Sequence, residues 1–179
     1  MSGGHGHVDH HSNKGIALLI AILALVLAFS ETLGKAAQTS AIAYNIEASN
    51  LWAFFQAKTI RQTTLRTAAE QLAVTHPSAK QIEAWRKTAD RYQTEPETGE
   101  GRKELAERAK VAEKKRDLAT AAYHHYEMAS AAVQIAIVLA SASIITAIAA
   151  LVWIAAGLGV IGVLFCGIGL FAPAAVHLF

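Results

Sequence analysis

The distribution of apolar residues along the chain is the feature that most constrains its fold. Residues 16–29 contain no polar side chain, and no charged residue occurs between Met128 and Val176. The segment between these blocks holds every Lys and Arg except Lys14. A helix needs ~20 apolar residues to cross a bilayer core, so the first block fits one span and the second fits two. The pattern predicts a membrane protein.

We predict an all-α fold with three transmembrane helices and a helical stalk inserted between the first and the second. The spans are placed at residues 15–33, 128–150 and 154–174, and the stalk occupies residues 34–127. We expect residues 1–14 to form a flexible His-rich tail. The apolar stretch "LVWIAAG" is expected to make the turn between the last two spans, with Trp153 at the headgroup level, where an amphipathic ring is favoured.

The stalk has the periodicity of paired helices. No Gly or Pro occurs between Gly34 and Pro77, and strong helix formers dominate. Breaks are expected near 76–78 and 94–101, and one continuous helix over 102–150. Matching helix lengths indicate a long antiparallel hairpin that is coiled-coil-like, with the pairing inside one chain or between chains left open. Apolar residues recur at four–three spacing, interrupted by Lys58 and Gln62, at Tyr44, Ala48, Leu51, Phe55, Lys58, Gln62, Leu65, Ala69 and Leu72.

The stretch "SNLWAFFQAKTIRQ" places three large aromatic residues, Trp52, Phe54 and Phe55, beside Lys58. One interpretation is packing within the stalk. The alternative is an oligomer or partner surface, because one neighbouring helix does not easily cover both Phe54 and Trp52.

Charge and cysteine content exclude some classes and orient the chain. The net charge of +2 is too small for a nucleic-acid binder, and the single Cys166 allows no disulfide within the chain. The concentration of Lys and Arg near the second span favours a cytoplasmic stalk. A cleaved signal peptide is the competing interpretation of the first apolar run, although its leader carries only Lys14 as a basic residue.

Two histidine-rich stretches are candidate metal sites. The tail contains His5, His7, His10 and His11, a density that can bind zinc, copper or nickel. The competing interpretation is a polar tail that binds metal only adventitiously. In "YHHYE", at the stalk–membrane junction, His124 and Glu127 share a helix face, and Glu31 is a candidate third ligand. The competing interpretation there is an interfacial belt, with Tyr123 and Tyr126 at the headgroup level and polar neighbours facing water.

Small residues recur at helical spacing within all three spans. Such seams let helix backbones approach closely in lipid. In the first span they are Ala17, Ala21, Ala24 and Ala28. In the last two spans the predicted packing positions are Ala136, Ala140, Ser143, Ala147, Gly159, Gly162 and Gly169.

The sequence contains no recognisable catalytic or nucleotide-binding motif. We therefore expect no enzyme, no catalytic residues and no cofactor. Glu31, at the end of the first span, is the only charged side chain in the three predicted spans, and none lies at the depth where a coupled transporter would use it. A pore made by an oligomer and lined by small and hydroxyl residues remains an alternative.

Three stretches together resemble a known family. They are "SNLWAFFQAKTIRQ", "YEMASAAVQIAIVLASASIIT" and "WIAAGLGVIGVLFCGIGLF", and the chain is similar to the bacterial membrane proteins called domain of unknown function 4337. The resemblance covers nearly the whole chain. It implies three spans with a helical insert, and it supplies no activity and no catalytic residues.

These observations lead to one expected role and one alternative. We expect a non-enzymatic, multi-pass protein of the bacterial inner membrane that self-associates as a structural or accessory subunit. Its expected partners are the lipid bilayer, further copies of itself and an unidentified membrane protein, and not nucleic acid. The alternative is an oligomeric ion channel, metal-linked through the His-rich tail.

Overall fold

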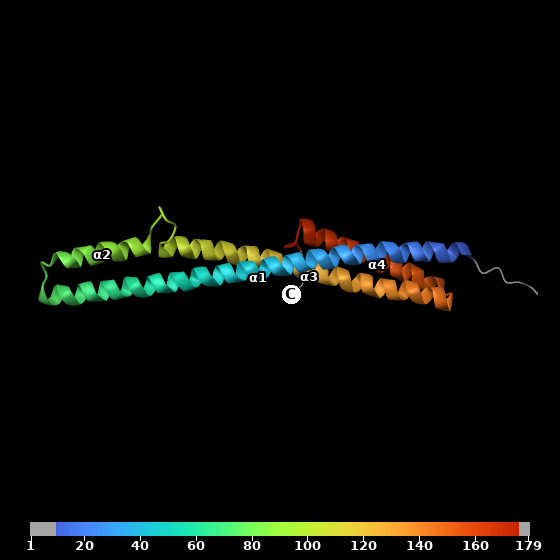
Figure 1. Cartoon of the computed structure of the whole chain (residues 1–179), viewed down its shortest axis with the longest axis horizontal. Coiled ribbons are helices and arrows are strands. Elements are labelled where there is room, and N and C mark those ends of the chain that lie inside the picture. The colour runs from blue at the N-terminus through green and yellow to red at the C-terminus, as the bar shows by residue number, and fades with distance from the viewer. Residues whose placement is uncertain (1–9, 176–179) are drawn as a thin grey trace, which may run out of the picture. The chain divides into compact units, whose positions relative to one another are not determined.

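The computed structural model describes residues 10–175, with side chains described from Lys14 onward. Four helices follow one another along the chain: α1 (His10–Thr75), α2 (Lys80–Gln93), α3 (Arg102–Thr146) and α4 (Ala149–Phe171) (Figure 1). The described part of the chain contains no β-strand. It forms two compact units, which we describe separately: unit 1 comprises residues 1–40 and 118–179, and unit 2 comprises residues 41–117.

Unit 1 contains the first part of α1, the last part of α3 and the whole of α4. Its buried core combines aliphatic residues of α1 with alanines of α3 and α4, since a small side chain lets a neighbouring helix approach closely. A hydroxyl pair also lies there, with Ser30 Oγ 2.6 Å from Ser130 Oγ. The core residues are Ile16, Leu23, Val133, Ala136, Ala140 and Ala155.

Three glycines of α4 lie where neighbouring helices approach it closely. A Cβ at Gly159 would lie 2.6 Å from Leu23 of α1, and a Cβ at Gly162 would lie 2.5 Å from Val133 of α3. A Cβ at Gly169 would lie 3.0 Å from the ring of Tyr126. Glycine weakens an isolated helix, so at these positions a lower helix propensity accompanies close packing.

The turn between α3 and α4 lies earlier in the chain than the sequence suggests. The helix expected over 102–150 ends at Thr146, and "LVWIAAG" lies inside α4, with Trp153 79% exposed there. The two-residue link, Ala147 and Ile148, turns because Ala147 adopts a φ of 55°, a conformation that residues other than glycine rarely take. No Gly or Pro marks the position, so the sequence carries no signal for it.

Unit 2 contains the last part of α1, the whole of α2 and the first part of α3. Its core is built from Ala48 and Leu51 of α1 together with Leu105, Ala109 and Ala112 of α3. All nine α1 positions with four–three spacing are buried or half-buried. In α2, Ile82 and Ala89 are buried, so one face of each helix supplies the core.

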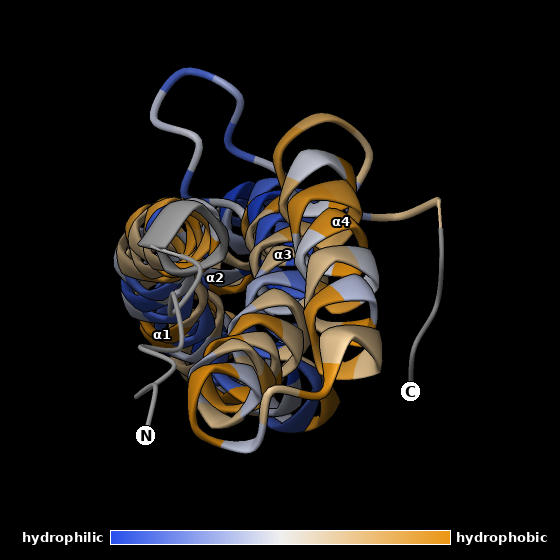
Figure 2. Ribbon diagram, turned by 90° about the vertical axis from the view of Figure 1, so that its right-hand side faces the viewer, coloured by the Kyte–Doolittle hydropathy of each residue, from blue (hydrophilic) through white to orange (hydrophobic). Residues whose placement is uncertain are grey.

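Three of the four helices are long and apolar enough to cross a membrane, namely α1, α3 and α4. Figure 2 shows α4 almost entirely in the colours of hydrophobic and neutral residues. At 1.5 Å per residue, the 23 residues of α4 extend over roughly 35 Å, against ~30 Å for a bilayer core.

Candidate functional site

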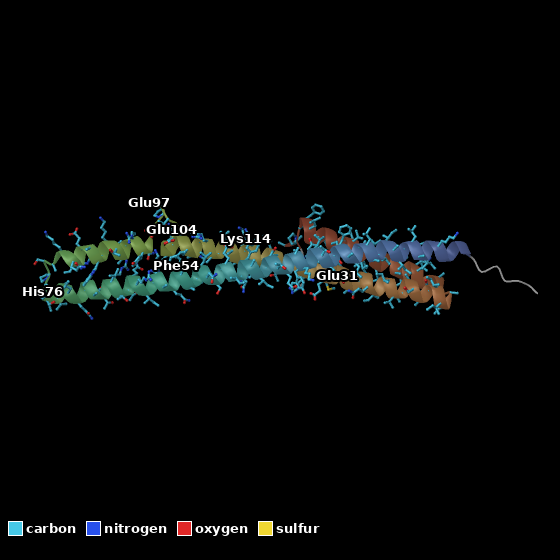
Figure 3. The ribbon with its side chains drawn as sticks, in the orientation of Figure 1. Glu31, Phe54, His76, Glu97, Glu104 and Lys114 are labelled. Carbon is cyan, nitrogen blue, oxygen red and sulfur yellow. The ribbon has the colours of Figure 1, made fainter. Side chains whose placement is uncertain are left out.

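A cluster of polar side chains, two of them buried, lies in unit 2 where α1, α2 and the start of α3 meet. Lys58 is 6% exposed and Gln62 is 2% exposed, and these are the two residues that interrupt the apolar spacing of α1. We call Lys58, Gln62, Gln93, Glu95 and Arg102 the polar junction. Figure 3 labels Phe54 of α1 and Glu104 of α3, which mark two of the elements that meet there.

Lys58 is held by carboxylates and by aromatic rings. Its Nζ atom lies 3.3 Å from Glu95 Oε2 and 3.9 Å from Glu100 Oε2. The same ammonium lies 5.4 Å from the ring centroid of Phe54 and 5.1 Å from that of Tyr92, within the range of a cation–π contact. A buried charge needs such partners, so Lys58 fixes the loop after α2 against α1.

Gln62 connects α1 to both of the other helices. Its Nε2 atom donates a hydrogen bond of 3.0 Å to the backbone oxygen of Ala89 in α2. Its Oε1 atom accepts a hydrogen bond from Arg102, the first residue of α3. Arg102 also donates to Gln93 Oε1 at 2.9 Å, and its guanidinium lies 4.9 Å from the ring of Phe55. Sequence spacing pointed to Lys58 and Gln62 but not to Arg102 or Gln93.

The three aromatic residues predicted as a surface are all half-buried beside the unit 2 core. Trp52 donates a hydrogen bond of 2.8 Å from Nε1 to Glu113 Oε1 of α3. The Trp52 ring packs edge-on against Phe55, with their centroids 5.4 Å apart. Phe54 and Phe55 lie beneath the cations of the polar junction. All three rings therefore have contacts within unit 2.

The "YHHYE" stretch in unit 1 differs from the interfacial belt described above. His125 is fully buried and Tyr126 is 4% exposed, so neither side chain faces water. The His125 Nε2 atom lies 3.2 Å from the backbone oxygen of Pro173, and its ring stacks on Phe165 with centroids 6.1 Å apart. A histidine at this point therefore joins α3 to the end of α4, through contacts that spacing along one helix does not reveal.

The candidate metal ligands are not brought together. His124 Nδ1 lies 3.7 Å from Glu127 Oε2, whereas Glu31 accepts a hydrogen bond of 3.4 Å from Gln134. Within residues whose side chains are described, no group of three or more His, Cys, Asp or Glu is placed to hold a metal ion. His5 and His7 lie outside the described residues, and only the backbone of His10 and His11, in α1, is described.

The predicted packing positions in the last two spans fall into two groups. Ala136, Ala140 and Ser143 of α3 are buried, and so are Gly159, Gly162 and Gly169 of α4. Ala147 lies in the α3–α4 turn and is exposed, so it packs against no neighbouring helix there. In α1 the alanines at 17, 21, 24 and 28 are exposed as well, and the α1 residues in the core are Ile16 and Leu23.

These features define the class of protein: within the described residues the chain is all-helical, with three helices long and apolar enough to span a membrane and a second compact unit that contains a buried lysine. The chain belongs to the family described as Domain of unknown function (DUF4337), whose model matches residues 12–172. No curated protein and no solved structure matches the chain.

Proposed function

We propose that the chain is a three-span integral membrane protein with a structural or accessory role, and that it acts as a self-associating subunit. In this proposal unit 2 is a helical hairpin stalk between the first and second spans. The polar junction is the observation that supports it most directly. Lys58, Gln62 and Arg102 each contact a residue of another element, and these contacts hold the helices of unit 2 together.

The absence of a visible chemical role for these groups favours a non-enzymatic protein. A nucleophile or acid–base pair must reach a substrate. Lys58 is enclosed by two carboxylates and two rings, and Gln62 has a partner at both ends of its amide. Such contacts stabilise helix packing and leave little capacity for a substrate.

We further propose that the stalk lies on the cytoplasmic side of a bacterial inner membrane. Unit 2 carries all Lys and Arg residues except Lys14 and Lys35. Basic residues close to a span are retained on the cytoplasmic side. Arg108, Lys110, Lys114, Lys115 and Arg116 all lie within about twenty residues of the expected start of the second span at residue 128.

The pore alternative has weaker support. The hydroxyls that would line it donate to their own helix: Ser141 to Ile137 at 2.8 Å, Ser143 to Ala140 at 2.6 Å and Thr146 to Ala142 at 2.9 Å. A serine that bonds to its own backbone is as compatible with lipid or protein contact as with water.

Labelling of single cysteines tests the placement. In a Cys166→Ser background, Ser78→Cys lies between α1 and α2, and Thr98→Cys lies between α2 and α3. A membrane-impermeant maleimide should label both positions only after the cells are permeabilised. Labelling in intact cells would show that the stalk lies on the opposite side of the membrane. Recovery of the protein in the soluble fraction would refute membrane integration. Native mass spectrometry in mild detergent tests self-association, and a single-copy mass would contradict it.

A further inference from the structure

The side of α1 that faces away from the unit 2 core is uncharged from Ile42 to Thr75. Ten positions follow one another at three- and four-residue steps, close to the 3.6 residues of a helical turn. Most of them lie two residues from a core position, which is about 200° around the helix. Nine are exposed and one is half-buried. We call these ten residues the outer stripe: Ile42, Ile46, Ser49, Ala53, Ala57, Ile60, Thr64, Ala68, Gln71 and Thr75.

The outer stripe is apolar for a helix face in a polar unit. Ile42 is 56% exposed, Ile46 is 55% exposed and Ile60 is 67% exposed. A helix that faces water normally places charged and polar residues on its outer side. The exposed faces of α2 and α3 in this unit do so, with Lys87 and Arg91 on α2 and with Lys103, Glu107, Lys110 and Lys114 on α3. The outer stripe therefore differs from the exposed faces of α2 and α3 in carrying no charge.

The surface of the stripe also leaves room for another helix. A shallow, open hollow on the surface of α1 is lined by Ile60, Thr64, Ala68 and Gln71 of the stripe and by three threonines beside it. Short side chains of this kind allow a second helix to approach closely, and methyl and hydroxyl groups pack without burying a charge.

We infer that the outer stripe binds the outer stripe of a second copy, with the two α1 helices parallel. This inference rests on the proposed self-association and names its surface. Copies in one membrane share one orientation, so a two-fold pair of α1 helices brings each residue opposite itself. Like charges opposite each other would repel, and a stripe without charge avoids this. Gln71 can also hydrogen-bond to its own counterpart, as single polar residues do to fix the register of parallel helices.

The available area is sufficient for such a pair. From Ile42 to Thr75 the helix extends over about 50 Å at 1.5 Å per residue, and a helix with side chains is ~11 Å wide. The contact then covers roughly 550 Å² on each copy, or ~1,100 Å² in total. This exceeds the ~1,000 Å² expected of a specific interface.

The part of α1 in unit 1 presents a similar face. Ala17, Ala21, Ala24 and Ala28 are all exposed there, and small residues at this spacing support helix association in lipid. In the sequence, Ala28 precedes Ile46 by eighteen residues, which is five turns of an ideal helix. Polar residues from Glu31 to Gln38 separate the two segments. The same helix thus offers a small, uncharged face in both of its segments.

Cysteine cross-linking of the full chain in its own membranes tests this inference. In the Cys166→Ser background, Ala53→Cys, Ala57→Cys and Thr64→Cys lie on the stripe. Glu47→Cys and Arg66→Cys are matched controls, because they are exposed positions of the same helix that lie off the stripe. Mild oxidation should convert the stripe variants to disulfide-linked dimers at least tenfold faster than the controls.

A charged substitution gives an independent readout. Ala57→Glu places two carboxylates opposite each other and should reduce the dimer fraction at least tenfold in native mass spectra, while amide exchange within unit 2 stays unchanged. Glu47→Gln is the control and should leave the dimer fraction intact.

The outcomes separate the two proposals. A defined oligomer that cross-links at Glu47→Cys or Arg66→Cys and not at the stripe would overturn the α1 surface and leave self-association standing. A single-copy mass, with no cross-link at any position, would overturn both. A partner of different mass bound in place of the second copy would overturn the self-contact.

Discussion

Replacing Gln62 with leucine tests whether the polar junction holds α2 in place. The change keeps the size of the side chain and removes its hydrogen bonds to Ala89, Gln93 and Arg102. A neutral hydrogen bond contributes about 1 kcal/mol net, and one to a charged group about 1.5–3 kcal/mol. Arg102 keeps its hydrogen bond to Gln93, so losing the bond between Gln62 and Arg102 costs an amount at the lower end of the charged range.

The expected net effect follows from these terms. Burying a leucine returns about 1.5 kcal/mol of the lost stability, which leaves a destabilisation of α2 packing of roughly 2 kcal/mol. At about 1.4 kcal/mol per tenfold change, the opening equilibrium of α2 should rise about thirtyfold. Because amides exchange through such openings, hydrogen exchange of α2 (Lys80–Gln93) should accelerate by a similar factor.

The assay uses the full chain in mild detergent, with exchange followed by mass spectrometry. Peptides of α4 should be unaffected and provide an internal reference. Gln56→Leu is the matched control, because it makes the same change at an exposed position of the same helix. Acceleration below about threefold in α2, or an equal effect of Gln56→Leu, would refute the view that Gln62 links the helices.

Three further predictions concern packing. Gly162→Ala should lower the free energy of unfolding by about 1–3 kcal/mol, because its Cβ would lie 2.5 Å from Val133. Gly157→Ala has nothing within 4 Å of its new Cβ and should raise the free energy of unfolding by up to ~1 kcal/mol. A lower thermal midpoint for Gly162→Ala than for Gly157→Ala would agree with this, and the reverse order would contradict it. Trp52→Phe should lower the free energy of unfolding by about 1 kcal/mol through loss of the hydrogen bond to Glu113. The mass of the oligomer in native mass spectra should stay unchanged, so a fall in that mass would show that Trp52 itself forms the subunit contact. Gly101→Ala should raise cleavage of the α2–α3 loop by a Glu-specific protease severalfold, because the new Cβ would overlap the Glu104 carboxylate and the backbone nitrogen of Glu95; unchanged cleavage would contradict this.

The proposed stripe gives a different account of the aromatic residues from the one their sequence suggests. Trp52, Phe54 and Phe55 are the most conspicuous residues of the stalk, and they were candidates for an interface. Their rings instead contact Glu113 and the cations of the polar junction. The candidate interface lies on a different side of α1, where no residue of the stripe is aromatic.

The sequence by itself determined the helical class, the three apolar helices and the family. Long apolar runs leave a membrane-crossing helix as the main solution, because backbone groups must be satisfied internally in lipid. The four–three spacing on α1 also predicted which residues of the stalk are buried, from Tyr44 to Leu72. Both signals are local, since they depend only on the order of residues along one helix.

Only the tertiary structure decided the contacts that depend on more than one helix. The α3–α4 turn occurs at Ala147 and Ile148 because the packing of the two helices, and no turn residue, determines its position. Arg102 joins the polar junction because α3 begins beside Gln62, and His125 is buried because Pro173 and Phe165 cover it. The positions of the other helices likewise decide whether a small-residue seam faces a neighbour or stays exposed, as at Ala17 and Ala21. Periodicity reveals a face of a helix but does not reveal what covers that face.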